Sequence, residues 1–116
     1  MPRDIPAYVR PVEPVLPPMP NPPPCPARLN VLLQGQTLVK ALSMAGESQA
    51  SLARYIAEAG DKKFFPYLVT FVVSGDMLFS QANAALAYRF MLERAWANSK
   101  ANGILFNALL AIMGAA

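Results

Sequence analysis

The sequence predicts an all-α chain in which an extended proline-rich N-terminal arm, residues 1–26, precedes a body of three to five helices, residues 27–116. Three observations predict this class. Eleven of the twelve prolines lie within the first 26 residues. Beyond them, six glycines recur at intervals typical of helix ends, and the apolar residues between them repeat at helical spacing. The later helices are expected to be strongly apolar.

Residues 1–26 can form neither a helix nor a central strand. Each proline holds φ near about −65°, lacks an N–H donor and drives the preceding residue towards extended backbone. In polyproline II, at about 3.1 Å per residue, the arm would reach roughly 75–80 Å. It contains no Gly and no Ser, so we expect a stiff strap and not a floppy tether.

The arm is too apolar for a linker that only needs to be solvated. A strap that cannot hydrogen-bond to itself is expected to lie against another surface. Its reach is large beside the small helical body, which favours a neighbouring chain as the support. The alternative is an arm folded back over its own body. The predicted partner-binding residues are Ile5, Tyr8, Val9, Val12, Leu16 and Met19.

Residues 27–60 are predicted to form two amphipathic helices. The first, residues 27–45, carries leucines and valines in a loose helical stripe that Gly35 interrupts. The second begins near residues 47–48 and ends at Gly60, because glycine supplies the left-handed residue that commonly follows a helix.

Residues 64–116 are predicted to form apolar helices, since 35 of these 53 residues are apolar. Residues 64–73 also suit a strand, because they are rich in β-branched and aromatic side chains. No other segment supplies a partner strand, and an unpaired apolar edge would invite aggregation. A helix with Pro66 in its first turn is therefore favoured.

Two further helices are expected to complete the body. A long one, residues 77–101, would be capped by Asp76 and ended by Asn102 and Gly103. Its first half is apolar nearly all round, which is typical of a helix buried by protein or by lipid. A last apolar helix over residues 104–113 follows.

The apolar stretch raises the question of a membrane span, which needs about 20 mostly apolar residues. The window 64–88 is long enough, but Asp76, Gln81 and Asn83 interrupt it, and a central Asp costs about 2.5–3.5 kcal/mol on insertion. We therefore expect either a membrane-embedded subunit or helices buried in a protein assembly. Asp76 is interpreted as a helix cap, with a proton or ion site as the alternative. The predicted membrane or interface residues are Phe64, Phe65, Leu68, Val72, Leu78, Phe79 and Trp96.

The composition excludes several kinds of chemistry. The chain has no His and a single Cys, Cys25, so it can form no Ser-His-Asp or Cys-His pair, no internal disulfide and no Cys/His zinc site. Ten Lys and Arg against seven Asp and Glu give a net charge of +3, which is too small to imply nucleic acid. There is no phosphate-binding glycine motif. We expect no enzyme, no cofactor and no metal, and an unreactive Cys25 thiol.

One short segment, Gly46-Glu47-Ser48-Gln49-Ala50-Ser51-Leu52-Ala53-Arg54-Tyr55-Ile56, resembles the first helix of a repressor-type helix-turn-helix. The resemblance covers 11 of 116 residues and rests on a Ser-Gln-x-x-Leu-Ala-x-x-Ile pattern. It implies a polar recognition helix after a short turn. The segment that follows, residues 64–69, is apolar instead, and Lys62 and Lys63 are the only nearby phosphate contacts. A DNA-binding regulator is therefore a minor alternative.

These features together predict a non-catalytic structural or accessory subunit that braces a large multi-protein assembly. Its partners would be other protein subunits, with lipid contact if the assembly lies in a membrane, and the chain would not be a solitary monomer. A membrane complex is favoured by the apolar helices, and a virion, with this chain in the capsid or tail of a virus or phage, is the alternative. The first 26 residues lack a continuous apolar segment, so we expect no cleavable signal peptide.

Overall fold

The computed structural model describes residues 18–99 and 103–115, and over these ranges the chain is all-helical, with no strand. Six helices are present in this part of the chain, one more than the upper limit of the prediction. Their bounds are α1 (Leu29–Leu32), α2 (Gly35–Ala45), α3 (Gln49–Ala59), α4 (Pro66–Ser74), α5 (Gln81–Asn98) and α6 (Ile104–Ile112).

The extra helix comes from the first predicted segment, residues 27–45. The chain leaves α1 at Leu33, and Gln34 adopts extended backbone with φ −145° and ψ 166° before α2 begins at Gly35. The side chains of Leu29 and Leu33 are fully buried on either side of this break. The sequence pattern alone predicts one helix that Gly35 interrupts. In the structure the chain bends between α1 and α2, and both leucines are buried at this bend.

The helix predicted over residues 64–73, in preference to a strand, is confirmed as α4. Pro66 is its first residue, where the missing N–H costs nothing because the first N–H groups of a helix have no partner within it. Gly75 ends α4 in the left-handed region, with φ 85°. The backbone N–H of Asp76 then donates to the carbonyl of Phe71 over 2.9 Å, which closes the helix end.

The helix predicted over residues 77–101 is shorter than expected, and Asp76 does not cap it. Helix α5 begins at Gln81, and the Ser80 hydroxyl accepts a 3.1 Å hydrogen bond from the backbone N–H of Asn83. The Asp76 carboxylate instead accepts a 2.8 Å bond from the Ser74 hydroxyl. The chain between α4 and α5 stays non-helical, and it places Phe79 in the core with 1% of its surface exposed.

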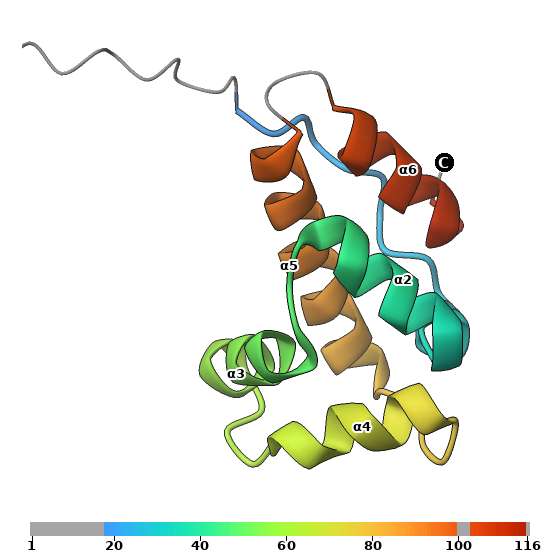
Figure 1. The fold of residues 1–116 in the computed structure, drawn as a ribbon, viewed down its shortest axis with the longest axis vertical. Coiled ribbons are helices and arrows are strands. Elements are labelled where there is room, and N and C mark those ends of the chain that lie inside the picture. Colours follow the sequence, from blue (N-terminus) through green and yellow to red (C-terminus); the bar gives the residue numbers. More distant parts are fainter. Residues whose placement is uncertain (1–17, 100–102, 116) are drawn as a thin grey trace, which may run out of the picture.

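Helix α5 lies at the centre of the helical body. Helices α1, α2, α3 and α6 all pack against it, and α4 packs against α2 and α3. Figure 1 shows α2 and α6 on one side of α5, α3 on the other side, and α4 across its N-terminal end. The largest fully buried side chains come from every helix, from two of the connections and from the residue that follows α6: Phe79, Leu29, Leu33, Leu38, Leu52, Ile56, Met91, Leu92, Leu109, Met113, Val69 and Val72.

Two polar side chains are buried within this core, and both are hydrogen-bonded. The Ser99 hydroxyl donates to the carbonyl of Ala95 over 2.7 Å and accepts from the backbone N–H of Leu105 over 3.1 Å, so it links α5 to α6. The Asn83 side-chain amide donates to the Asp61 carboxylate over 3.4 Å. Within the described residues, every buried side-chain nitrogen or oxygen has a partner, as is typical of well-packed interiors.

Candidate functional site

Three aromatic side chains, one just before α4 and two within it, form an exposed apolar surface, which we call the α4 aromatic surface. Phe65, Tyr67 and Phe71 expose 53%, 56% and 44% of their surface. Soluble proteins rarely expose several large apolar side chains side by side, and such patches mark interaction sites. This is the strongest candidate for a functional site in the described part of the chain.

The rings of the α4 aromatic surface contact one another in series. Phe65 and Tyr67 are nearly parallel, with centroids 5.8 Å apart and an interplanar angle of 6°. Phe71 lies one helical turn after Tyr67 and meets it edge-on, with centroids again 5.8 Å apart and an angle of 80°. Such mutual contacts hold each ring in place, so the surface is preorganised before any partner arrives.

The opposite side of α4 faces the core, which explains why these rings point outward. Val69 and Val72 are fully buried, and Leu68 is partly buried against the same core. The exposed Thr70, also on α4, donates a hydrogen bond from its hydroxyl to the side-chain oxygen of Gln49, the first residue of α3, over 3.4 Å. One face of the helix therefore seals the body while the other is left open.

The predicted membrane or interface residues fall into two groups. Phe64, Val72 and Phe79 belong to the core, and the Phe64 and Phe79 rings lie 6.1 Å apart between centroids. Phe65 and Leu78 are exposed, while Leu68 and Trp96 are partly buried. Tyr67 and Phe71 were not predicted: their four-residue spacing was visible, but so was that of Leu68 and Val72, and the pattern alone does not say which pair faces outward.

The arm residues are only partly described. Five predicted partner-binding residues, Ile5, Tyr8, Val9, Val12 and Leu16, lie outside the described residues. Met19, the sixth, packs partly buried against the core of its own chain. The alternative support for the arm, its own body, is therefore the one observed for residues 18–27.

Residues 18–27 run along α5 in the opposite direction to the helix (Figure 1). Met19 lies near Glu93, in a shallow pocket that both residues line. Further on, the Tyr88 hydroxyl donates to the carbonyl of Pro23 over 2.7 Å, and the Gln81 amide reaches the carbonyl of Ala27 over 3.5 Å. The two contacts satisfy backbone carbonyls that a proline-rich segment cannot satisfy itself.

Cys25 lies in this segment, partly buried and without a disulfide partner. Burial raises the pKa of its thiol, because the thiolate would lose solvation. Burial likewise raises the pKa of the Tyr88 hydroxyl, and the nearby Cys25 adds to the effect. The neutral thiol is a poor nucleophile and a poor metal ligand.

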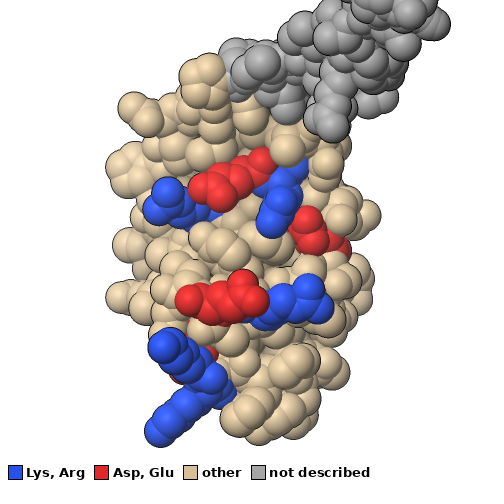
Figure 2. Space-filling view, turned by 90° about the vertical axis from the view of Figure 1, so that its left-hand side faces the viewer, with Lys and Arg blue, Asp and Glu red and all other residues tan. Residues whose placement is uncertain are grey.

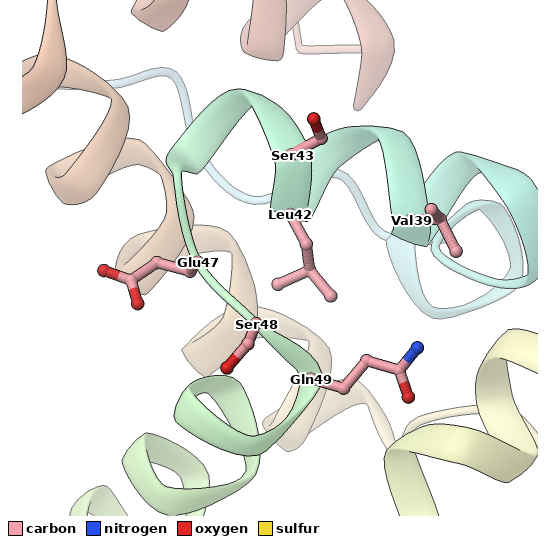
Figure 3. A pocket seen from close by; sticks show the side chains of 6 residues that line it. All are labelled: Val39, Leu42, Ser43, Glu47, Ser48 and Gln49. Atoms are coloured by element: carbon pink, nitrogen blue, oxygen red, sulfur yellow. The ribbon is translucent and has the colours of Figure 1, made fainter.

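A pocket of about 360 Å³ lies where α2 meets α3 (Figure 3), and we considered it as a ligand site. Its lining residues are Val39, Leu42, Ser43, Glu47, Ser48 and Gln49. The Ser48 hydroxyl is already used as the cap of α3, since it accepts from the backbone N–H of Ser51 over 3.1 Å. The Glu47 carboxylate points away from the pocket and lies 3.4 Å from the Arg94 guanidinium. These polar groups serve the fold and do not converge on a ligand.

Charged side chains of both signs alternate over the side of the molecule seen in Figure 2. One such region holds Arg54 and Glu58 of α3, Arg94 of α5, and Glu47 from the connection between α2 and α3. Mixed charge of this kind gives no single-sign field of the sort that binds a phosphate backbone. Among the described residues, no three His, Cys, Asp or Glu side chains gather closely enough to hold a metal ion.

The candidate membrane window, residues 64–88, is divided between α4 and α5 by the non-helical residues around Gly75. Across residues 18–99 and 103–115, none of the helices combines the length and the apolarity that crossing a bilayer requires. Comparison with models of protein families, with curated proteins and with solved structures finds no match to this chain.

Proposed function

We propose that this chain is a non-catalytic structural or accessory subunit of a larger protein assembly, and that it binds a neighbouring protein subunit through the α4 aromatic surface. The observation that carries the proposal is the exposure of Phe65, Tyr67 and Phe71 as one contiguous, preorganised set of rings. Aromatic side chains are enriched at the centres of protein interfaces, where a few of them supply most of the binding free energy.

The size of the surface argues that it is one part of a larger contact. Burying an aromatic side chain completely contributes about 2–3 kcal/mol, and each ring is already about half covered. The three together would contribute roughly 3–4 kcal/mol, which association costs would largely offset. A stable complex therefore needs a second contact, and the proline-rich arm is the natural one to supply it.

For the kind of assembly that contains this chain, we propose the same two candidates that the sequence predicts. A membrane complex is favoured by the apolar composition after Phe64, and a virion remains the alternative. Partners would be other protein subunits, with lipid contact in the membrane case.

The DNA-binding alternative gains no support. In a helix-turn-helix arrangement, α4 would follow α3 as the recognition helix. Its exposed side chains include Tyr67 and Phe71 but no Lys, Arg, Asn or Gln, the residues that most often read base edges. An aromatic surface of this kind suits a protein partner better than a DNA groove.

Photocrosslinking tests the proposal. We would introduce p-benzoylphenylalanine in place of Tyr67 in the full chain and irradiate cells of its natural host. The matched control carries the same group at Ala85, an exposed residue of α5. We expect discrete adducts to one or a few protein subunits from position 67 and none from position 85. Equal, diffuse crosslinking from both positions, or none from either, would overturn the proposal.

A second measurement asks whether the surface is needed for assembly. The double variant Tyr67→Ser, Phe71→Ser should keep the circular dichroism spectrum of the wild type, because both side chains are exposed. In velocity sedimentation of a lysate, we expect the wild type in a fast fraction and the variant at the top of the gradient. Wild-type protein that sediments as a single chain would contradict the proposal.

A further inference from the structure

We propose that the ligand of the α4 aromatic surface is the proline-rich segment of residues 1–17 from a second copy of this chain. The inference rests on the proposed function, because it names the partner of the surface described there. It joins two features that are otherwise unexplained: an exposed set of aromatic rings, and a proline-rich N-terminal segment whose composition suits such rings.

The chemistry of the two parts is complementary. Residues 1–17 contain five prolines, and Ile, Tyr, Val and Leu stand between them. Proline-rich segments favour polyproline II, and proteins recognise them with adjacent aromatic side chains, because the rigid segment loses little entropy on binding. Phe65, Tyr67 and Phe71 provide three such rings in contact.

The surface also offers a donor to a carbonyl of the segment. A polyproline II segment has no internal hydrogen bonds, so its carbonyls need donors from the partner. The exposed hydroxyl of Tyr67 is one such donor.

The chain already uses this mode of recognition once. The Pro22–Pro24 run lies against α5, where the Tyr88 ring lines the same shallow pocket and the Tyr88 hydroxyl donates to the carbonyl of Pro23 over 2.7 Å. An aromatic ring and its hydroxyl thus hold a proline-rich stretch in the described part of the arm. Tyr67 offers the same ring and the same donor in an open position.

The position of the arm favours a second copy over the same molecule. Met19 lines a pocket together with Glu93, in the C-terminal half of α5, whereas α4 lies across the N-terminal end of that helix (Figure 1). Glu93 lies 12 residues after Gln81, the first residue of α5, so these places are about 18 Å apart along the helix. Residues 18–27 run from the first place towards the second, so the preceding residues would have to reverse direction to reach α4.

Self-association of the full chain provides the first test. We expect concentration-dependent association by sedimentation equilibrium, weakened at least about tenfold by Tyr67→Ser, Phe71→Ser. A synthetic peptide of residues 1–17 should compete with it, and the same peptide with Ala at every proline should not. The matched control, Ala85→Ser on α5, should associate like the wild type. A full chain that stays monomeric would overturn the inference.

Complementation distinguishes arm exchange from direct packing of two α4 helices. One variant carries Ala at Pro6, Pro11 and Pro14, and the other carries Tyr67→Ser, Phe71→Ser. Each should associate poorly alone, yet a mixture should recover association, because one variant keeps the surface and the other keeps the segment. No recovery on mixing would overturn the inference. A proline variant that associates by itself like the wild type would also overturn it, in favour of α4–α4 packing.

Crosslinking of mixed ¹⁴N and ¹⁵N wild-type chains separates the second copy from the same molecule. The crosslinked pairs of peptides that join residues 1–17 to α4 should include pairs with one ¹⁴N and one ¹⁵N peptide. If both peptides of every pair carry the same isotope, the inference is overturned. The outcome is also separable from that of the proposed function. If the peptide fails to compete while benzoylphenylalanine at position 67 still captures a different subunit, this inference fails and the proposed function stands.

Discussion

The Tyr88 hydroxyl donates a 2.7 Å hydrogen bond to the carbonyl oxygen of Pro23, 65 residues earlier in the chain. Tyr88 is 4% exposed and sits on α5, at the centre of the helical body. This contact helps to tie residues 18–27 to the core, and it is the first target for mutation.

Replacing Tyr88 by Phe removes the hydroxyl and keeps the ring. We expect the free energy of unfolding to fall by about 1 kcal/mol, since the Pro23 carbonyl loses its donor in a partly buried place. Urea unfolding measures the change. The matched control, Tyr67→Phe, removes an exposed hydroxyl and should change the stability by less than about 0.5 kcal/mol. Equal effects of the two substitutions would mean that the arm contact contributes nothing.

The capping box of α3 gives a second prediction. The Ser48 hydroxyl accepts from the backbone N–H of Ser51, and the Ser51 hydroxyl accepts from that of Ser48 over 2.9 Å. Ser48→Ala should cost about 1 kcal/mol, because one N–H of the first turn loses its acceptor. Ser43→Ala, within α2 and exposed, should be neutral or slightly stabilising, since Ala is the better helix former. Thermal unfolding of the two variants is the comparison.

Two glycines with positive φ separate backbone strain from steric conflict. A Cβ at Gly75 (φ 85°) would meet no atom within 4 Å, whereas a Cβ at Gly46 (φ 69°) would lie 2.7 Å from the Asn98 amide nitrogen. That nitrogen donates to the carbonyl of Ala45 over 2.7 Å. We expect Gly75→Ala to cost about 1 kcal/mol and Gly46→Ala about 2–3 kcal/mol, because only the second also breaks a hydrogen bond. Urea unfolding that ranks the two the other way would contradict this packing.

Two phenylalanines test the division between core and surface. Phe79→Ala should destabilise the fold by about 3–5 kcal/mol, since the side chain is 1% exposed and leaves a cavity. Phe71→Ala, at 44% exposure, should cost less than about 1 kcal/mol. A large loss of stability in the second variant, measured by urea unfolding, would show that the α4 aromatic surface is needed for folding and not reserved for a partner.

Alkaline pH should weaken the arm contact. Burial raises the pKa of both the Cys25 thiol and the Tyr88 hydroxyl, and both groups are neutral when protonated. Their contribution to stability is complete below the unfolded values of about 8.5 and 10, and it is lost as the pH rises through the higher folded values. Urea unfolding between neutral pH and pH 10.5 should show this decline. Cys25→Ala should remove the part of this decline that begins at the lower pH. A stability that does not change with pH in the wild type would contradict the prediction.

Helix positions were largely predictable because their end signals are local. Ser48 before α3, Pro66 at the start of α4 and the left-handed glycines after α2 and α4 act within a few residues of the helix they bound. Helix α3 also ends at Gly60, as predicted, but with φ −159° and not in the left-handed region. The predicted start of α5 was wrong, because Ser80 caps the helix and Asp76 does not. Asp and Ser are about equally good caps, so the sequence does not choose between them. Between the two residues, the structure places Phe79 in the core.

The candidate site was less predictable because exposure depends on distant packing. Phe64 and Phe65 are adjacent and chemically identical, yet Phe64 is 4% exposed and Phe65 is 53% exposed. The Phe79 ring, 15 positions further on, covers the first and not the second. Met19 is a similar case, because its side chain packs against a core built from residues that lie far along the sequence.

The two faces of α4 place folding and recognition on different side chains. Val69 and Val72 hold the helix against the body, while Phe65, Tyr67 and Phe71 take no part in sealing it. Natural variation can therefore change the outer rings without disturbing the scaffold beneath them. Over evolution, homologous chains can therefore change or lose their binding specificity while they keep the same fold.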